Sequence, residues 1–460
     1  MNFLFTKNHI ASLVFFRIAF GILAFLDVLV TWIYYHLKMN AFDPANYQFK
    51  YIGFEWAQAI PEPFMSLFFI CLCMAALGIA LGYYYKACSI FFAFGFTYVF
   101  LLEKANYLNH AYLFCLISYM MIFFPADRAF SFDSIKGRVK YIEYIPYWPI
   151  FVLQFSMAVV YIYGGIAKLN SDWLHAYPLK IWLPYKKDYF LIGNLLNQEW
   201  LAWFMSYGGL FHDLFIIPFM IVKRTRWLAF GGAIVFHLMN TAIFQIGIFP
   251  WLSLVLTALF FGSEFPLSLN NYLKNKVPMV RRWNFSYLKV LSKNKLHLNK
   301  ANYKESKNQN LIKIALSIYF LYMLIVPFRH HLYKGNVAWT EEGHRYSWRM
   351  MLRGKRAYGH YLVKNNITKE EIKVKPKEIL SKKQARKSLT HPDMIWQFSN
   401  HLGDIYKDKW QTDSVSVYPN VKAKLHFRKY QEFVEPNTDL TKKEWKHLES
   451  ADWIVPLKEK

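Results

Sequence analysis

The chain has 460 residues, of which 55% are hydrophobic and 20% aromatic, and its formal net charge is +25 at pH 7. This apolar and aromatic content is well above that of an ordinary soluble domain and predicts a polytopic membrane protein. The excess of Lys and Arg falls mainly in loops and in the last third of the chain. We interpret it as a surface for anionic lipid headgroups and not as a nucleic-acid site.

Nine apolar segments are long enough to span a membrane. In chain order they cover residues 12–36, 62–84, 87–103, 108–126, 147–169, 209–223, 227–245, 247–263 and 311–328. Glycine pairs interrupt the sixth and the seventh, which leaves the number open by one or two. The first segment has no small-residue cleavage site, so we expect an anchor and not a signal peptide. Its Arg17 and Asp27 are interpreted as structural polar groups of the bundle.

The loop charges predict an orientation. With a cytoplasmic N-terminus, most loop Lys and Arg lie on the inner side, including the dense basic loop 264–313, and few lie on the outer side. The positive-inside rule favours this arrangement. Everything after about residue 330 then lies outside the membrane.

The last part of the chain differs in pattern from the bundle. Short alternating runs such as "HYLVK", "EIKVK" and "SVSVYPNVKAKLHF" are typical of strands, and the run that starts at His391 has apolar positions at helical spacing. The predicted fold class is a polytopic α-helical membrane bundle with a C-terminal extramembrane α+β domain. We place the bundle at 1–330 and the α+β domain at 331–460, a size that supports its own core.

All four cysteines fall in apolar segments, and the outer part has none. This distribution provides neither a disulfide framework nor a zinc-binding spacing, so no metal site is assigned. The sequence also lacks the signature motifs of the common nucleotide-binding and hydrolase folds.

Ionisable groups in membrane segments are candidates for function. Lys168 ends the fifth segment on the outer side. The pair Asn109 and His110 opens the fourth segment on the same side. His237 and Asn240 lie close to the outer end of the seventh. Apolar surroundings disfavour an ammonium group, so Lys168 can act as a base, and His and Asn side chains at the same depth can hydrogen-bond an oxyanion.

Structural interpretations of the same residues stay open at this point. Lys168 can extend to the membrane surface, Asn109 can cap the start of a helix, and His237 can be a hydrogen-bonded core residue. The residue types themselves indicate an apolar substrate, admitted from the lipid, whose hydroxyl group is deprotonated by lysine close to the outer leaflet.

A series of segments follows in the same order as in a known family. They are "FRIAFGILAFLD", "YVFLLEKANYLNHAYL", "GIAKLNSDW", "FHLMNTAIFQIGIF", "PFRHHLYKGNVAWTEEGHRYSWRMM", "HPDM" and "SADWIVPL". On these segments the sequence resembles the vitamin K-dependent γ-glutamyl carboxylases and their bacterial relatives with the horizontally transferred transmembrane (HTTM) domain. The similarity covers nearly the whole chain.

The resemblance implies an integral protein of a bacterial inner or plasma membrane that couples epoxidation of a reduced naphthoquinone to carboxylation of peptide glutamate. The family's essential lysine precedes Leu-x-x-Asp-Trp and falls on Lys168, which would deprotonate the quinol. His110 would stabilise an oxyanionic quinone intermediate, and Asn109 would help to orient it. The implied cofactor is reduced vitamin K or a menaquinone-type hydroquinone, with O2 and CO2 as co-substrates.

The resemblance also implies binding residues and partners. The quinone pocket would include His237, Asn240 and Tyr107. The segment associated with glutamate binding, for which aromatic packing is an equally good explanation, falls on Trp339, Thr340, Tyr346, Ser347 and Trp348. The implied partners are membrane lipid, an isoprenoid naphthoquinone and a glutamate-containing peptide or protein.

The sequence departs from the animal members of the family. They have two adjacent lysines where this chain has Ala167 and Lys168, and the chain ends at Lys460, so a propeptide-docking surface is expected to be reduced or absent. Two other classes stay open. One is a homologue that oxidises quinol or modifies a lipid without carboxylating protein. The other is an electron-transfer protein with His110 and His237 as axial haem ligands, although no single span carries paired histidines.

Overall fold

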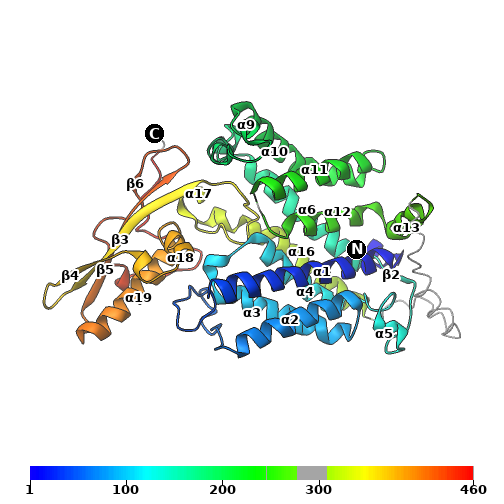
Figure 1. Cartoon of the computed structure of the whole chain (residues 1–460), viewed down its shortest axis with the longest axis horizontal. Coiled ribbons are helices and arrows are strands. Elements are labelled where there is room, and N and C mark those ends of the chain that lie inside the picture. The colour runs from blue at the N-terminus through cyan, green and yellow to red at the C-terminus, as the bar shows by residue number, and fades with distance from the viewer. Residues whose placement is uncertain (245, 277–307, 459–460) are drawn as a thin grey trace.

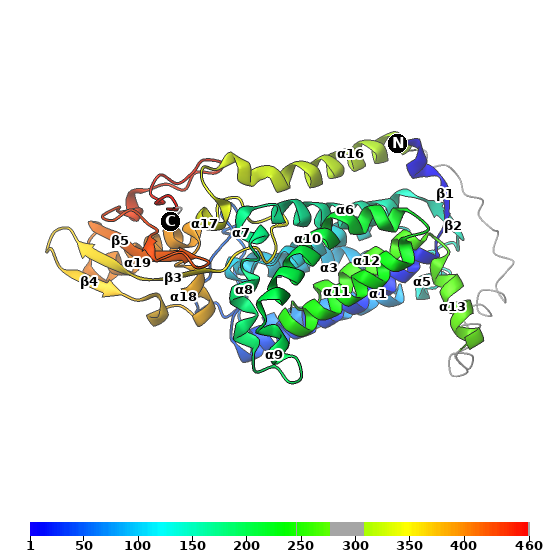
Figure 2. The same ribbon diagram turned by 90° about the horizontal axis from the view of Figure 1, so that it is seen from above.

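The structure of the protein is a computed structural model that describes residues 1–244, 246–276 and 308–458. A helical bundle forms one part and an α+β domain the other. The α+β domain lies at the end of the bundle opposite the N-terminus, as Figure 1 and Figure 2 show from two directions. Most of the expected basic loop 264–313 lies outside the described residues.

The main helices of the bundle lie side by side along its length, except for the helix after residue 264, which turns away from them (Figure 2). They are α1 (Ala11–Val30), continued by η2 (Thr31–Lys38), α2 (Phe64–Leu81), α3 (Tyr85–Leu102), α4 (Asn109–Phe123), α6 (Trp148–Lys168), α10 (Glu199–Ile221), α11 (Arg226–Phe244), α12 (Phe249–Ala258), α13 (Phe265–Lys276) and α16 (Gln309–Ile325). The short elements between them are β1 (Lys7–His9), which pairs with β2 (Tyr144–Pro146), and the helices α5 (Phe132–Ile135), α7 (Ser171–Leu174), α8 (Leu179–Trp182) and α9 (Gly193–Leu196).

Among the described residues, seven helical stretches are long and apolar enough to span a membrane. The stretch Phe249–Phe261, which contains α12, and α13 meet at a bend of 97°. If the two form one span, the number of candidate spans is eight. The described residues thus provide seven or eight candidate spans, which lies within the one or two by which the expected number of nine is left open. The difference arises because α4 has only 15 residues and because α12 ends at the bend. The sixth segment is longer than expected, since the glycine pair 208–209 lies inside α10 without interrupting it.

Burial within the bundle identifies α6 as its central helix. In α6, 72% of the apolar stretch is buried inside the protein, whereas the buried share is 17% in α11 and 22% in the stretch that contains α16. The peripheral helices expose large apolar side chains such as Phe204 and Leu228, which is typical of a surface that faces lipid. Arg17 of α1 is buried and donates hydrogen bonds to three carbonyl groups of the loop that follows α4. It therefore ties two parts of the bundle together, in agreement with a structural role.

The outer domain is built on a four-stranded antiparallel sheet in the order β4-β3-β5-β6. β3 and β5 pair along their whole length, and α19 packs with them in one hydrophobic core. The fold class predicted from the sequence is thus confirmed. The elements of this domain are α17 (Val337–Thr340), β3 (Lys355–Asn365), β4 (Glu371–Val374), α18 (Lys382–Lys387), α19 (Pro392–Trp410), β5 (Val415–Leu425) and β6 (Gln431–Glu432).

Charged contacts and two tryptophans fix the outer domain to the bundle. Asp393 at the start of α19 pairs with Lys104, just after α3, at 2.6 Å and with Arg345 at 2.7 Å. Trp339 lies in the hydrophobic core of the outer domain, whereas Trp348 lies in that of the bundle. The segment between α17 and β3 is therefore anchored in both parts and lies over the end of the bundle.

Candidate active site between the bundle and the outer domain

Two adjoining cavities lie where the bundle meets the outer domain. The smaller, of about 100 Å³, lies among α6, α10 and α11. The larger, of about 1770 Å³, lies between the bundle and the outer domain. Ile246, Phe249, Met350 and Met351 line both cavities and form the boundary between them.

Lys168 ends α6 and lines the small cavity. Nζ lies 2.5 Å from Asp213 Oδ2 on α10 and donates a hydrogen bond to the Gly164 carbonyl at 3.1 Å. It also lies 5.3 Å from the centre of the Trp173 ring. Lys168 is only 6% exposed, and its amine binds to a neighbouring helix. This geometry disagrees with a lysine that extends to the membrane surface.

Asp213 and His212 belong to the same site, although the sequence interpretation missed them. One carboxylate oxygen of Asp213 accepts from Lys168, and the other lies 3.0 Å from His212 Nδ1. His212 Nε2 is buried without a hydrogen-bond partner in the described part of the chain, and the ring stacks on Phe236. An acidic residue in an otherwise apolar helix is the sequence signal that identifies Asp213 as a candidate.

His237 and Asn240 of α11 line the small cavity together with Lys168. His237 Nε2 and the Tyr161 hydroxyl form a hydrogen bond of 2.8 Å, and Tyr161 also lies 3.2 Å from the Thr257 hydroxyl. The structure thus brings three of the sequence-predicted residues into one cavity. His237 is also hydrogen-bonded in the core. It is therefore both a structural residue of the bundle and a lining residue of the cavity.

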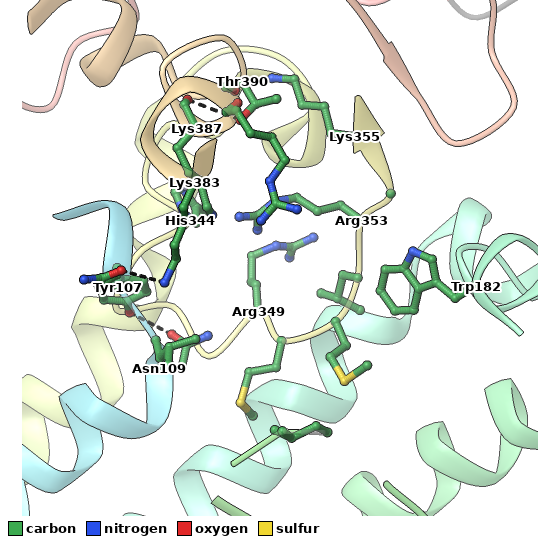
Figure 3. Close-up of a pocket in the computed structure, with 18 of the residues that line it drawn as sticks. Tyr107, Asn109, Trp182, His344, Arg349, Arg353, Lys355, Lys383, Lys387 and Thr390 are labelled. Atoms are coloured by element: carbon green, nitrogen blue, oxygen red, sulfur yellow. Dashed lines mark hydrogen bonds between the residues drawn. The ribbon is translucent and has the colours of Figure 1, made fainter. Parts of the chain in front are cut away.

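Tyr107, Asn109 and His110 line the large cavity and not the small one. The Tyr107 hydroxyl donates a hydrogen bond to Asn109 Oδ1 at 2.7 Å. The N-cap of α4 is Leu108, and Asn109 is the first residue of the helix. Asn109 therefore does not cap α4, and the structure leaves its side chain at the wall of the cavity (Figure 3).

Phe249 contacts histidines from both cavities. His110 stacks on the Phe249 ring at a centroid distance of 5.9 Å, and His237 meets the same ring edge-on at 6.3 Å. Because an aromatic ring contacts both histidines, and His237 Nε2 is bonded to Tyr161, this geometry gives no support to a haem bound by the two residues.

The residues that the sequence associates with glutamate binding line neither cavity. They are Trp339, Thr340, Tyr346, Ser347 and Trp348. The two tryptophans are 0% and 1% exposed, Thr340 and Ser347 are also buried, and the Tyr346 backbone N–H donates to the Tyr107 hydroxyl at 2.6 Å. These residues support the segment before β3, in which Glu341, His344, Arg345 and the residues from Arg349 onward line the large cavity.

The wall that the outer domain contributes to the large cavity is strongly cationic (Figure 3). Its Lys and Arg residues are Arg345, Arg349, Arg353, Lys355, Arg356, Lys383, Arg386, Lys387 and Lys424. The acidic residue that the described outer domain adds to this wall is Glu341. Burial lowers the pKa of Lys355 to about 7, and burial together with Arg353 lowers the pKa of Lys387 to about 7. An anion bound at this wall would favour the protonated form of both amines, so the wall is suited to anions.

Glu341, His344 and His391 form a buried group at the edge of this wall. In the described part of the chain their possible metal-ligand atoms all lie within 4.8 Å of one another. However, Arg353 pairs with Glu341 at 2.6 Å, and the Lys387 amine lies 3.5 Å from His391 Nε2. Positive charges at these distances oppose a bound cation. We therefore assign no metal to this group.

The fold and the site define an integral membrane protein with several helical spans, an extramembrane α+β domain and a buried polar site where the two meet. Residues 5–265 match the HTTM domain, and residues 308–460 match the lumenal domain of vitamin K-dependent gamma-carboxylase. The chain belongs to the vitamin K-dependent γ-carboxylase family. No solved structure gives a significant match to the chain.

Proposed function

We propose that the protein is a γ-glutamyl carboxylase-like enzyme that couples O2-dependent epoxidation of a reduced naphthoquinone to carboxylation of glutamate. The observation that carries the proposal is the buried amine of Lys168, which lines a mainly apolar cavity bordering a larger cationic one. Membership of the family implies the use of vitamin K hydroquinone, O2 and CO2.

The small cavity fits the headgroup of a quinol. Its lining is mainly apolar and aromatic, with Phe236, Phe244 and Phe249, and its polar groups are few. Such a lining binds a flat apolar ring and orients it through a small number of hydrogen bonds. When bound, a reduced naphthoquinone would supply, with O2, the strong base that carboxylation of glutamate requires.

Lys168 and Asp213 act in this proposal as one unit that holds a proton. With Nζ and Oδ2 2.5 Å apart, a proton taken from a hydroxyl group can rest on the amine while the carboxylate balances its charge. The resting pair is charged, so the amine must first lose its proton before it can accept one from the quinol. His212, bonded to the other oxygen of Asp213, can take up this proton.

The other polar residues would position and stabilise a developing oxyanion. Asn240 faces the same small cavity as Lys168, and His237 is held there by Tyr161. His110 and Asn109 lie on the other side of Phe249, and Tyr107 orients Asn109 through its hydroxyl group. Pre-oriented donors of this kind lower the energy of charge that forms during a reaction.

We assign the glutamate substrate to the large cavity. Arg349 and Arg353 line this cavity, and a guanidinium group binds a carboxylate through two parallel hydrogen bonds. The residues inferred from the family pattern would act indirectly, by holding the segment that carries the two arginines. They are Trp339, Thr340, Tyr346, Ser347 and Trp348.

We infer further that residues 1–330 form the membrane unit and residues 331–460 an external or periplasmic unit, in a bacterial inner membrane. The N-terminus and α13 lie at the end of the bundle away from the outer domain (Figure 2). The loop charges favour the cytoplasm for that end.

A second candidate function is oxidation of quinol, or modification of a lipid, without carboxylation of protein. It is favoured by one observation: the small cavity has its base and its polar groups independently of the outer domain, whereas the residues inferred for glutamate binding line no cavity.

Incubation of the purified protein with reduced naphthoquinone, O2, labelled bicarbonate and a glutamate peptide tests both functions. Epoxide and fixed carbon are measured separately, with heat-denatured protein as the control. Formation of both products supports coupled carboxylation, and epoxide without fixed carbon supports the second candidate. Absence of both products would contradict the assignment of Lys168 chemistry to quinol.

A further inference from the structure

The cationic wall of the large cavity carries more positive charge than one glutamate carboxylate balances. Arg349 and three residues of α18, Lys383, Arg386 and Lys387, line the cavity and form no ion pair with a described acidic residue. Like charges held together on a partly buried wall repel one another. The wall is therefore suited to a second anionic group besides the substrate carboxylate.

Lys383, one of the cations of α18, lies against η2 and the turn that follows α3. The spacing of three and four residues places Lys383, Arg386 and Lys387 on one face of the helix. The Lys383 amine donates to Asn106 Oδ1 at 2.6 Å and lies 5.3 Å from the centre of the Tyr35 ring. Burial, with Arg386, also lowers the pKa of Lys383, an effect that a bound anion would oppose.

The bundle side of this part of the cavity is mainly apolar. Its apolar lining comprises Val30, Tyr35 and Phe42 from α1, η2 and the following loop, and Phe96, Val99 and Phe100 from α3 and its end, while Asp27 and Thr31 add polar groups. Val30 is 56% exposed, and its neighbours Ile33 and Leu37 are exposed apolar side chains of the same helical stretch. The cavity therefore reaches the lipid-facing surface of the bundle beside Val30.

We propose that the part of the large cavity between η2, α3 and α18 binds a membrane lipid with a phosphate headgroup. The phosphate contacts Lys383, Arg386 and Lys387, and the acyl chains lie along the apolar wall that begins at Val30 and Tyr35. A phosphate offers negative charge and several acceptor oxygens to these donors. α18 lies beside the end of the bundle where α1 ends (Figure 1).

This lipid site is independent of the proposed reaction, because its residues do not include Lys168, Asp213 or the polar groups of the small cavity. Loss of lipid binding and loss of quinol oxidation are therefore separate results. The site also makes a specific claim about the ligand, since it requires an apolar tail as well as a phosphate.

The test measures binding of phosphatidylglycerol to the purified, delipidated full chain by native mass spectrometry and by thermal unfolding. We expect native protein to retain phosphatidylglycerol and to gain thermal stability from it. The double variant Lys383→Gln/Lys387→Gln should bind it about tenfold more weakly or worse, because basic side chains beside anionic lipid each contribute to binding. Lys442→Gln is the control, since this side chain is 74% exposed and lies outside the cavity.

Two further measurements, one with inorganic phosphate and one with a single variant, decide the outcome. Inorganic phosphate at the same concentration should give no comparable stabilisation, and an equal effect of phosphate would show a free oxyanion site and overturn the lipid assignment. Arg386→Gln changes an exposed side chain and serves as a second variant if the double variant does not fold. Equal phosphatidylglycerol binding by native protein, Arg386→Gln and Lys442→Gln would overturn the proposal.

Discussion

Replacing Asp213 by asparagine tests whether Lys168 is held in a charged pair inside the bundle. Both residues are buried, and their charged atoms lie 2.5 Å apart. The amide would leave an ammonium group without its counter-charge in surroundings of low dielectric constant. Removal of one partner of a buried ion pair costs about 3–5 kcal/mol. We expect Asp213→Asn to lower the free energy of unfolding by about this amount.

The assay is a double-mutant cycle on unfolding in detergent. It compares native protein, Lys168→Met, Asp213→Asn and the double variant, in which neither charge remains. Glu199→Gln is the matched control because it lies on the same helix and pairs with Lys180 at 2.7 Å through a side chain that is 71% exposed. An exposed pair of this kind contributes little to stability.

The cycle should give a coupling energy of about 3 kcal/mol between Lys168 and Asp213. The double variant should lose less stability than the sum of the losses of the two single variants. A coupling energy near zero, with Asp213→Asn no less stable than Glu199→Gln, would refute the charged pair. Lys168 would then be neutral in the resting protein, and the role given to Asp213 would be wrong.

An impermeant thiol reagent added to intact cells should label Lys442→Cys in the outer domain and not Asn271→Cys in α13, because the loop charges place them on opposite sides; the reverse labelling would invert the topology. Trp339→Ala should cost the protein about 3–5 kcal/mol of stability because the side chain is fully buried; unchanged thermal unfolding would contradict its core position. The free energy of unfolding should rise from about pH 7 to about pH 9. The reason is that the pKa of Lys355 and of Lys387 is about 7 in the folded protein, whereas unfolded lysines keep their protons to about pH 10. A decrease over this range, measured by denaturant unfolding, would show that these amines are not buried.

The positions of the spans and the depth of the buried site residues could largely be predicted from the sequence. Both follow from local properties, namely the length of an apolar run and the distance of a residue from its end. Lys168, His237 and Asn240 line one cavity for this reason. The number of spans was less predictable, because the short α4 and the bend after α12 depend on where helices end. Gly262 at this bend has a φ of +110°, a conformation that other residues rarely adopt.

The side chains that line the large cavity could not be predicted in the same way. Periodicity shows which face of a helix or strand is buried, but the loop before β3 has no period. Trp348 therefore packs into the bundle while Arg349, the next residue, lines the cavity, and only tertiary contacts decide between them. Asp213 differs, because an acidic residue in an apolar span already indicates a buried polar site.

Epoxide formation by the Lys168→Arg variant tests most directly the claim that this buried amine is the base. Arginine keeps a positive charge beside Asp213, so the variant should fold, but its guanidinium stays protonated and cannot accept a proton. We expect no epoxide from reduced naphthoquinone and O2, while Lys442→Arg, a change at a side chain that is 74% exposed and lies outside both cavities, retains activity. Thermal unfolding of both variants controls for folding. An active Lys168→Arg variant would show that this position requires a charge and not a transferable proton, and would contradict the proposed mechanism.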